Sequence, residues 1–559
     1  MPELPRPAPT VTADSAVFWD AAAEGRLVAQ RCASCGELRH PPRPMCPWCH
    51  SLDVEVTELS GLGTVYSFER IHYPPTPYFD YPVPGILVEL DEGIRLVSSI
   101  VGVDDVDLTL DGPVIGMRVQ ARFEPTADQP DGTQAMVPVF EPAPADAPPA
   151  PERAERPVLA PRGVSSSARA GTPQVADRAA IVGIGQTEFS KRAGRSELQL
   201  ASESITAALD DAGLSTSDVD GIVTYTVDPV EETELIRSVG FDGIAYSTRI
   251  PYGGGGSMGV LVAAATAIAS GAADVVVAYR AIRARSGSRF GGAKVAPSPT
   301  SGHSGTLAMQ WCMPYGVMTP ASWMGLNSVR YMHRYGVTSA DIGRAVVQMR
   351  DYASTNPAAW GYDKPITLDD HQSSRWIVEP AIRLFDCCQE TDGSVAVVLT
   401  SAERAADLAH RPVLVRAVGM SGLFDSEIAS DHQLPDLSVM AGSVGLADRL
   451  FGRFGISRDD IDAAMIYDAF SPLLLMQLEA LGFCGLGEAK DFIADGNLTP
   501  TGSLPTNTHG GLIGEGYIHG LNLVTEATRQ LRGTAVNQLD DPRTILVTAS
   551  RTGAILGVA

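Results

Sequence analysis

A stretch rich in proline, alanine and serine divides the chain into two unequal parts and excludes a single compact fold. Residues 141–176 (EPAPADAPPAPERAERPVLAPRGVSSSARAGTPQVA) carry too few large apolar side chains to bury a core, so we expect an extended, semi-rigid tether there. The chain has 559 residues, which exceeds the length at which a single hydrophobic core stops growing. We therefore predict one domain over residues 1–140 and a larger one over residues 177–559.

The charge and hydropathy of the chain exclude several classes of partner. The net charge of −24 argues against a nucleic-acid surface, because phosphate binding needs clustered lysine and arginine. An anionic acyl-CoA ligand stays open, since a local arginine cluster or a helix N-terminus can oppose the overall field. No run of about 18 apolar residues suggests a membrane span, and residues 1–10 lack the basic and apolar regions of a secretory signal. We expect a cytoplasmic protein.

Short β-rich runs precede the tether, at residues 64–68, 85–90, 94–101 and 117–123. Proline, glycine and aspartate separate them, as is typical of turns between strands. This pattern predicts a small β-barrel. A small sandwich is the alternative, because strand spacing alone does not decide whether a sheet closes.

An alternation of strands and helices follows the tether. The clearest helix is predicted over residues 197–212, where Ser196 and Gln199 form a capping-box pattern and Gly213 ends the helix. A buried strand precedes it. Further along, a glycine-rich turn leads into an alanine-rich helix and another buried strand. These segments are residues 179–183, 217–223, 253–256, 258–270 and 274–278.

The same order of elements recurs in the C-terminal part. Residues 455–466 (GISRDDIDAAMI) align without a gap with residues 213–224 (GLSTSDVDGIVT). Downstream, Gly533 matches Gly271, and residues 544–547 match the strand that follows that glycine. We predict two related α/β halves, with bounds of about 177–400 and 401–559. Chance similarity between two βα units is the alternative.

The cysteines near the N-terminus have the spacing of a metal site. Two Cys-x-x-Cys knuckles separated by ten residues, at Cys32, Cys35, Cys46 and Cys49, can deliver four thiolates to a tetrahedral Zn²⁺. With all positions filled by sulfur, the zinc would be structural. Two disulfides or a redox dithiol are the alternatives. Four other cysteines are scattered, and Cys387 and Cys388 are interpreted as core thiols.

Residues around these cysteines carry a family resemblance. Phe18-Trp19, Gly25-Arg26-Leu27, Gln30-Arg31-Cys32, Pro41-Pro42-Arg43 and residues 61–67 (GLGTVYS) resemble the zinc-ribbon plus OB-fold family associated with acyl-CoA enzymes, over residues 15–140. The resemblance implies a partner-supporting role that helps to complete an acyl-CoA channel. A nucleic-acid-binding OB fold is the competing interpretation, but the acidic balance disfavours it.

The larger domain resembles the sterol-carrier-protein-type thiolases over residues 178–559. The motifs that carry the resemblance are residues 386–394 (DCCQETDGS), 467–471 (YDAFS) and 507–511 (NTHGG). The resemblance implies an α/β thiolase fold with duplicated βαβ halves, layered α-β-α-β-α, and a homodimer through this domain. Coenzyme A would then be part of the substrate.

The catalytic cysteines of that family are missing. Counting back from Ile268 and Gly271 places Gly254 where the nucleophile at the start of the buried helix would stand, and no cysteine follows Cys484. Both histidine-bearing motifs instead hold tyrosine, at Tyr467 and Tyr517. Without a nucleophile no acyl-enzyme can form, but acid–base chemistry remains available.

Two phenols beside the α–β bond of an acyl-CoA suit a retro-aldol cleavage. One would act as tyrosinate on the β-hydroxyl proton, and the other would protonate the thioester enolate. An unperturbed phenol has a pKa of about 10, so the base needs cationic or hydrogen-bonding support, for which His509 and His519 are candidates. Asp468 would orient Tyr467 or a loop. We expect further substrate contacts from the glycine-rich turns and their neighbours, Gly254, Gly255, Ser257, Asn507, Gly510 and Gly511.

The same motifs resemble the lipid-transfer-type aldolases of steroid side-chain degradation, which pair with the zinc-ribbon family and use two tyrosines at these positions. The resemblance implies cleavage of a β-hydroxyacyl-CoA, typically a tertiary alcohol on a steroid D-ring, into a ketone and a shorter acyl-CoA. A hydratase is a further partner to consider.

Other interpretations of the same residues stay open. A non-catalytic acyl-CoA or sterol carrier would keep the pocket only for binding, but such a protein has no need for paired acid–base groups. A condensing acyltransferase using Ser257 would lack its histidine base. Tyr467 and Tyr517 could be half-buried aromatic residues, and His509 and His519 could be ordinary hydrogen-bonded residues.

Overall fold

The computed structural model describes residues 2–104, 107–128, 132, 134–152, 173–251, 254–287, 289, 291–292, 309–422 and 432–558. Most of the predicted tether therefore lies outside the described residues. Its first two residues belong to the last strand of the N-terminal domain, which runs to Pro142. Within the described ranges, no helix is long and apolar enough to cross a membrane.

The N-terminal domain begins with helix α1 (Ala16–Ala23), which packs beside a three-stranded antiparallel sheet of order β2-β1-β3. Strand β1 ends at Cys32, so the first cysteine knuckle forms the turn into β2. These strands are β1 (Val28–Cys32), β2 (Leu38–Arg39) and β3 (Val54–Glu58).

A closed barrel follows, which confirms the prediction of a barrel over a sandwich. Strand β4 pairs with β5 and β7, β5 pairs with β6, and β7 pairs with β8. The ring closes where the Val101 amide donates to the Phe140 carbonyl at 2.8 Å, beside a bridge between Ile100 and Phe140. The strands are β4 (Leu62–Ile71), β5 (Val83–Leu90), β6 (Arg95–Ser99), β7 (Arg118–Asp128) and β8 (Gln134–Pro142).

The larger domain is built on a nine-stranded sheet of order β11-β10-β12-β15-β9-β16-β19-β18-β17. The sheet is two half-sheets joined edge to edge by a short pairing of β9 with β16. The N-terminal half contains β9 (Ala179–Gln186), β10 (Gly221–Tyr225), β11 (Tyr246–Ile250), β12 (Val275–Arg283) and β15 (Asp392–Ser401). The C-terminal half contains β16 (Val413–Met420), β17 (Ala463–Ile466), β18 (Thr544–Ala549) and β19 (Thr552–Gly557).

The predicted duplication is visible in detail. Outward from the seam, strands β9, β15, β12 and β10 correspond in order to β16, β19, β18 and β17. In one half Asp220 accepts hydrogen bonds from the amides of Asp274 and Val275. In the other half Asp462 accepts from the amides of Arg543 and Thr544. An equivalent aspartate in each half therefore links two neighbouring strands.

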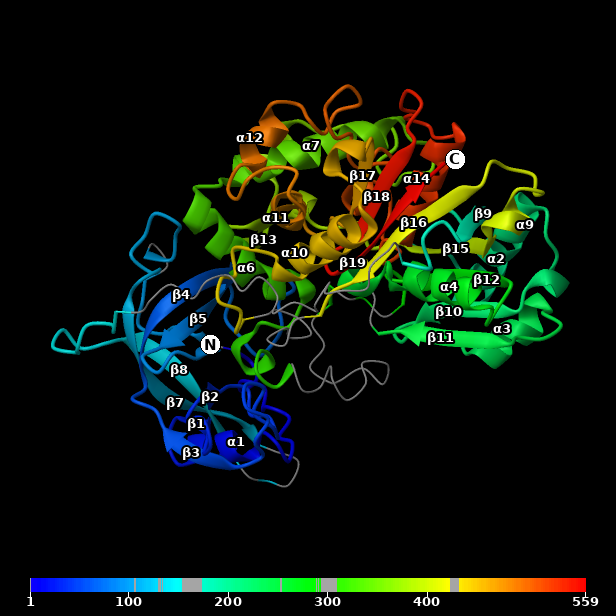
Figure 1. Cartoon of the computed structure of the whole chain (residues 1–559). Helices are drawn as coiled ribbons and strands as arrows, with labels where there is room; N and C mark the ends of the chain where they lie inside the picture. The colour runs from blue at the N-terminus through cyan, green and yellow to red at the C-terminus, as the bar shows by residue number, and fades with distance from the viewer. Residues whose placement is uncertain are drawn as a thin grey trace.

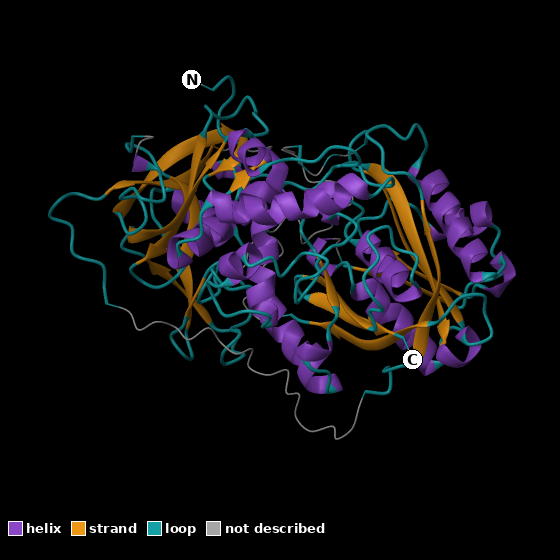
Figure 2. Cartoon of the chain, turned by 90° about the horizontal axis from the view of Figure 1, so that it is seen from above, coloured by secondary structure: helices purple, strands orange, loops and turns teal. Residues whose placement is uncertain are grey.

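Two helices occupy the middle of the layered domain. Helices α4 (Gly259–Ser270) and α14 (Leu521–Arg532) each contact strands of both half-sheets, while α2 (Glu197–Ala212) covers the outer face of the N-terminal half. Helix α10 (Ala441–Ala447) lies against the C-terminal half. Figure 2 shows helices on both sides of the strands, and the contacts of α2, α4, α10 and α14 agree with the predicted α-β-α-β-α layers.

Helix α2 has the predicted bounds, with one difference at its start. The Ser196 side chain accepts a hydrogen bond from the Gln199 amide, and Gly213 ends the helix with a left-handed φ of 68°. The Gln199 side chain bonds Glu203 at 3.0 Å instead of returning to Ser196. The capping box is therefore only half formed, because an acceptor one turn ahead holds the glutamine.

The segment between β12 and β15 carries the surface that meets the N-terminal domain. Strand β13 (Trp376–Glu379) pairs with barrel strand β4, so one sheet continues across both domains (Figure 1). The Ser67 hydroxyl donates to the Leu326 carbonyl of α6 at 2.6 Å, and Trp19 stacks on Trp311 at 4.9 Å between ring centroids. The elements of this segment are α6 (Pro320–Tyr335), α7 (Ser339–Thr355), α8 (Leu368–Ser373), β13 and β14 (Ile382–Arg383).

The remaining helices connect the strands described above. They are α3 (Glu232–Val239), α9 (Ala402–Ala405), α11 (Ser471–Leu481), α12 (Ala489–Ala494) and α13 (Gly511–Gly514). Every residue of α11 is buried, which places it in the core beneath the end of β17.

Candidate active site

The two tyrosines predicted to act together lie in direct contact. Tyr467 is the first residue after β17, and Tyr517 lies in the loop between α13 and α14. Their hydroxyl oxygens are 3.0 Å apart, and their rings meet at 62°. The side chains are 5% and 8% exposed, respectively. Tyr467 and Tyr517 are 50 residues apart in the sequence, and the fold brings their hydroxyl groups within hydrogen-bond distance.

Gly254, which the sequence predicts to stand at the position of the missing nucleophile, faces this pair. A Cβ atom built on Gly254 would lie 3.1 Å from the Tyr467 hydroxyl oxygen. Gly254 also has a φ of 55°, which favours glycine. The tyrosine hydroxyl therefore occupies the space into which a side chain at 254 would project.

The neighbouring predicted contacts serve this turn in different ways. The Gly255 carbonyl accepts a hydrogen bond from the Thr552 hydroxyl at 3.2 Å. Ser257 is fully buried, and its hydroxyl has no hydrogen-bond partner among the described residues. Its carbonyl accepts from the Tyr225 hydroxyl at 3.0 Å. Without a base, the Ser257 hydroxyl is not activated as a nucleophile.

Asp468 points to the start of helix α13 rather than to a tyrosine hydroxyl. One carboxylate oxygen accepts from the Leu512 amide at 2.8 Å, and the other has no partner among the described residues. Burial raises the pKa of Asp468 to about 7. A Cβ on Gly511 would lie 2.1 Å from the free oxygen, and one on Gly510 would lie 2.5 Å from the Cβ of Ala353. Both glycines allow this close approach.

Asn507 holds the end of β17. Its carbonyl oxygen accepts from the Ile466 amide at 2.7 Å, and its amide group donates to the Ile466 carbonyl at 2.8 Å. The side chain is therefore engaged with the backbone next to Tyr467. Asn507, His519 and Ser550 all have positive φ, at 51°, 50° and 48°, and such strain in non-glycine residues concentrates at functional sites.

The predicted histidines lie in different places. His509 makes no hydrogen bond or ring contact with either tyrosine within the described part of the chain, and its nearest ionisable partner is Glu515 at 3.8 Å. Burial lowers the pKa of His509 to about 3. His519 packs edge-on against the Tyr517 ring, with centroids 5.2 Å apart and planes at 90°. Burial, and then the charge of Arg280, hold the pKa of His519 well below its usual value.

Both imidazoles are thus neutral near pH 7, so the histidines proposed for cationic or hydrogen-bonding support carry no charge there, and the cation next to His519 is Arg280. Its Nε donates to Nδ1 of His519 at 2.9 Å, and its Nη1 pairs with Asp228 at 2.7 Å. Sequence reasoning missed Arg280 and Asp228. The available signal was an arginine in the middle of the apolar run that forms β12, because charged residues are rarely buried unless paired.

The backbone places Cys388 next to the segment that follows Tyr467, because the Cys388 amide donates to the Ala469 carbonyl at 2.9 Å. Cys388 is the neighbour that, after burial, most raises the pKa of Tyr517, and it raises that of Tyr467 as well. Burial also raises the pKa of the Cys388 thiol well above its usual value. The predicted core thiol is therefore a neutral group beside both phenols.

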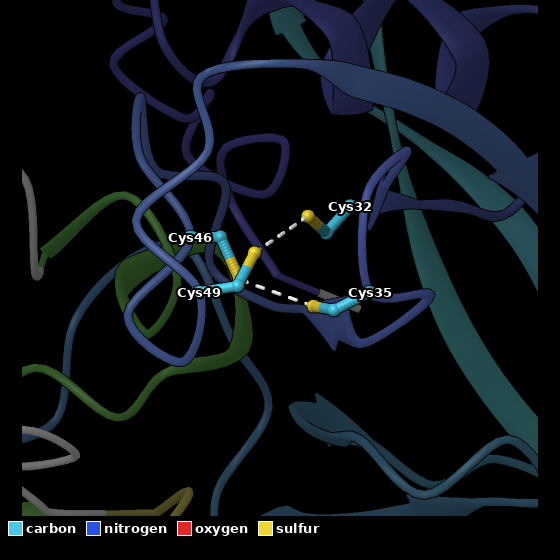
Figure 3. A group of neighbouring side chains, drawn as sticks. All are labelled: Cys32, Cys35, Cys46 and Cys49. Carbon is cyan, nitrogen blue, oxygen red and sulfur yellow. Dashed lines mark hydrogen bonds between the residues drawn. The ribbon is translucent and has the colours of Figure 1, made fainter.

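The four N-terminal cysteines converge as a metal site requires (Figure 3). Their sulfur atoms all lie within 4.8 Å of one another, with Cys32 and Cys49 at 3.4 Å and Cys35 and Cys46 at 3.6 Å. A tetrahedral zinc with Zn–S bonds of about 2.3 Å needs sulfur atoms roughly 3.8 Å apart. The four thiols are free of disulfides, so the residues fit a structural zinc ion.

Family comparisons match three parts of the chain. Residues 19–55 match the ChsH2 rubredoxin-like zinc ribbon domain, residues 56–124 match the ChsH2 C-terminal OB-fold domain, and residues 426–556 match the thiolase C-terminal domain-like family. The N-terminal part is also 42% identical over 142 residues to a probable enoyl-CoA hydratase alpha subunit of Thermomonospora curvata, covering 25% of this chain and 41% of that protein.

Proteins named as an aldolase and as a lyase align with about two thirds of the chain. A steroid side-chain-cleaving aldolase of Thermomonospora curvata is 49% identical, over 68% of this chain and 97% of that protein. The 17-hydroxy-3-oxo-4-pregnene-20-carboxyl-CoA lyase of Mycobacterium tuberculosis is 48% identical, over 68% and 99%. Among solved structures, an Ltp2-ChsH2(DUF35) aldolase matches with a TM-score of 0.65 and 48% identity, covering 69% of this chain and 99% of the matched one.

Proposed function

Because the chain belongs to the family of steroid side-chain-cleaving aldolases, a group of carbon–carbon lyases, we propose that Tyr467 and Tyr517 perform a retro-aldol cleavage. The proposed substrate is a β-hydroxyacyl-CoA whose hydroxyl is a tertiary alcohol on a steroid D-ring. The products would be a ring ketone and a shorter acyl-CoA. The observation that carries the proposal is the 3.0 Å contact between the two hydroxyl oxygens.

The proton balance of the reaction needs two groups that can exchange a proton. One phenol, as phenolate, takes the β-hydroxyl proton. The C–O double bond forms, the α–β bond breaks, and its electron pair moves into the thioester enolate. The other phenol protonates the α-carbon. Transfer of a proton between the phenols across their hydrogen bond then restores the starting state, so no outside acid or base is consumed.

The same arrangement argues against a covalent intermediate. Position 254 has no side chain, and the Tyr467 hydroxyl fills the space in front of it. The fully buried Ser257 hydroxyl lacks the base that an acyltransferase would need. A carrier without catalysis would have no need for two buried acid–base groups held in contact.

The direct test is an assay for bond cleavage. We expect the purified chain to convert a tertiary steroid β-hydroxyacyl-CoA into a ketone and a shorter acyl-CoA, separated by chromatography and identified by mass. Tyr467→Phe and Tyr517→Phe should each lower kcat by about 10²-fold or more, the usual contribution of acid–base catalysis. Tyr362→Phe, at an exposed tyrosine, is the matched control. Binding without turnover across a panel of such thioesters would favour the carrier.

The N-terminal domain would support this reaction through its structure. We propose that Cys32, Cys35, Cys46 and Cys49 hold a structural Zn²⁺, which supplies folding energy and no reaction step. Coenzyme A would enter as part of the substrate. A site of four reduced thiolates is also compatible with the cytoplasm, where thiols stay reduced.

We further propose two protein partners. Strand β11 lies at the end of the nine-stranded sheet, and among the described residues it pairs with β10 alone. Its free edge suits a second copy of the chain, which would give the expected homodimer. A hydratase subunit is the second partner, supported by the likeness of the N-terminal part to a probable enoyl-CoA hydratase alpha subunit. Light scattering of the purified chain, alone and mixed with such a hydratase, tests both.

A further inference from the structure

A buried ion pair lies behind Tyr517, and the tyrosine mechanism alone does not require it. Arg280 stands in the middle of β12 and Asp228 follows β10; the two strands lie next to each other (Figure 1). The side chains are 1% and 0% exposed and are 2.7 Å apart. Withdrawing two charges from water is unfavourable, and buried pairs of this kind contribute little net stability. Stability therefore does not explain why the pair is present, and the side chains that Arg280 contacts indicate its role.

Arg280 connects Asp228 to the active site through one histidine. Its Nε donates to Nδ1 of His519 at 2.9 Å. A guanidinium has donors only, so Nδ1 is the acceptor and the proton of the neutral ring sits on Nε2. The edge-on contact between His519 and Tyr517 follows at 5.2 Å. Four side chains thus form a continuous line from a buried carboxylate to a reacting phenol.

The two phenols face different charges. Burial most strongly raises the pKa of Tyr517, and Cys388 and Glu390 raise it further. The hydrogen bond with Tyr467 and the positive charge of Arg280 lower it. Of these neighbours, only Arg280 carries a permanent positive charge.

The largest influences on Tyr467 all act in one direction. Burial raises its pKa well above the usual value, and Tyr517, Cys388 and Asp468 raise it further. Arg280 therefore distinguishes between two otherwise similar phenols.

We propose that Arg280 is a positioning residue for the cleavage reaction, which with Asp228 as its partner holds His519 against Tyr517 and stabilises Tyr517 as the phenolate that takes the β-hydroxyl proton. This proposal rests on the retro-aldol function proposed above. Tyr467, which keeps its proton, then donates to the α-carbon of the enolate. After release of the products, the proton on Tyr517 returns to Tyr467 across their 3.0 Å contact.

Substitution of Arg280 and substitution of Asp228 should shift the rising limb of the pH–rate profile in opposite directions. Arg280→Met removes the cation, so the rising limb of kcat should move to higher pH, with about tenfold lower kcat below the limb for each unit of pH shifted. Asp228→Asn leaves the cation uncompensated and should move the limb to lower pH. Arg280→Lys, which keeps the charge, should restore the limb toward its original position. Lower kcat in both single variants with an unmoved limb would reduce the pair to a structural role and overturn the proposal.

A matched control and a second readout keep the test decisive. Arg283 lies on the same strand and forms an ion pair with Glu197 at 3.0 Å. Arg283→Met should leave the rising limb of the pH–rate profile in place. If Arg280→Met does not fold, Arg280→Met/Asp228→Asn removes both charges, and its limb should still lie above that of the parent.

Ionisation of Tyr517 can also be followed without turnover. The ultraviolet absorbance titration of Tyr467→Phe, minus that of Tyr467→Phe/Tyr517→Phe, isolates Tyr517. Its midpoint should rise when Arg280→Met is added, even if no cleavage substrate is found, so failure of the proposed function stays separate. An unchanged midpoint would also overturn the proposal.

Discussion

A Cβ atom placed on Gly325 of α6 would lie only 2.0 Å from Oε2 of Glu69 on barrel strand β4. The Glu69 carboxyl is fully buried between the domains and has no hydrogen-bond partner within the described ranges. Docking of the two domains therefore depends on a glycine that leaves room for a carboxyl group.

Gly325→Ala should weaken this docking. Alanine favours a helix over glycine by about 1 kcal/mol, but here its methyl group would displace Glu69. We expect a lower thermal midpoint and faster proteolysis between the domains. Gly325→Ala/Glu69→Ala, which removes the obstructing carboxyl, should recover part of the loss. A gain in stability from Gly325→Ala alone would contradict the described packing.

Stability should depend on pH through Glu69. Burial raises the pKa of Glu69 well above its usual 4.5. The folded state therefore holds the proton more tightly than the unfolded state, and the stabilisation present below about pH 4.5 is lost as pH rises toward the folded pKa. Glu69→Gln, which cannot ionise, should flatten this decline. Urea unfolding from about pH 5 to 8 measures it, and equal slopes for the two proteins would rule out the assignment.

A side chain at position 254 should obstruct the tyrosines. Gly254→Ala would place a methyl group 3.1 Å from the Tyr467 hydroxyl and strain a φ of 55°. We expect a drop in kcat of about tenfold or more, because acid–base catalysis depends on aligned groups. Gly271→Ala has a similar φ of 74° but open space around it, so it reports backbone strain alone. Equal losses in the two variants would remove steric contact as the cause.

Removal of zinc should change the environment of the tryptophans at the interface between the two domains. A strong chelator, or Cys35→Ser, should release about one zinc per chain and unfold the ribbon. Because Trp19 stacks on Trp311, tryptophan fluorescence should change with the metal content. Cys484→Ser, at a cysteine far from the cluster in sequence, should keep both. Full zinc retention in Cys35→Ser would argue against the four-cysteine site.

Local signals predicted much of the fold. The bounds of α2 follow from Ser196 and Gly213, which act on the adjacent backbone, and the duplicated strands follow from a repeat that can be read in sequence order. Strand β8 was not predicted, because Pro138 interrupts its apolar run. It forms because Ala121 and its neighbours on β7 provide a pairing edge.

The candidate site was predictable where motifs mark positions and not where distant charges meet. Tyr467 and Tyr517 each stand where the family motif has histidine, so the sequence alone identified them as candidate catalytic residues. Arg280 and His519 are 239 residues apart and share a hydrogen bond only in the folded chain. His509 sits in a motif as well, but its burial, without a hydrogen bond to any described residue, is a property of the tertiary structure.

The pairing of β13 with β4 means that the boundary in the chain is not a boundary in the sheet. The aldolase of Thermomonospora curvata covers 68% of this chain with 97% of its own length, so it lacks a counterpart of the remaining part. Two separate polypeptides joined by the pairing of β13 with β4 would form an equivalent assembly. The covalent connection then fixes the stoichiometry and the effective concentration of the two domains: every larger domain keeps one N-terminal domain beside it, whatever the dilution of the protein.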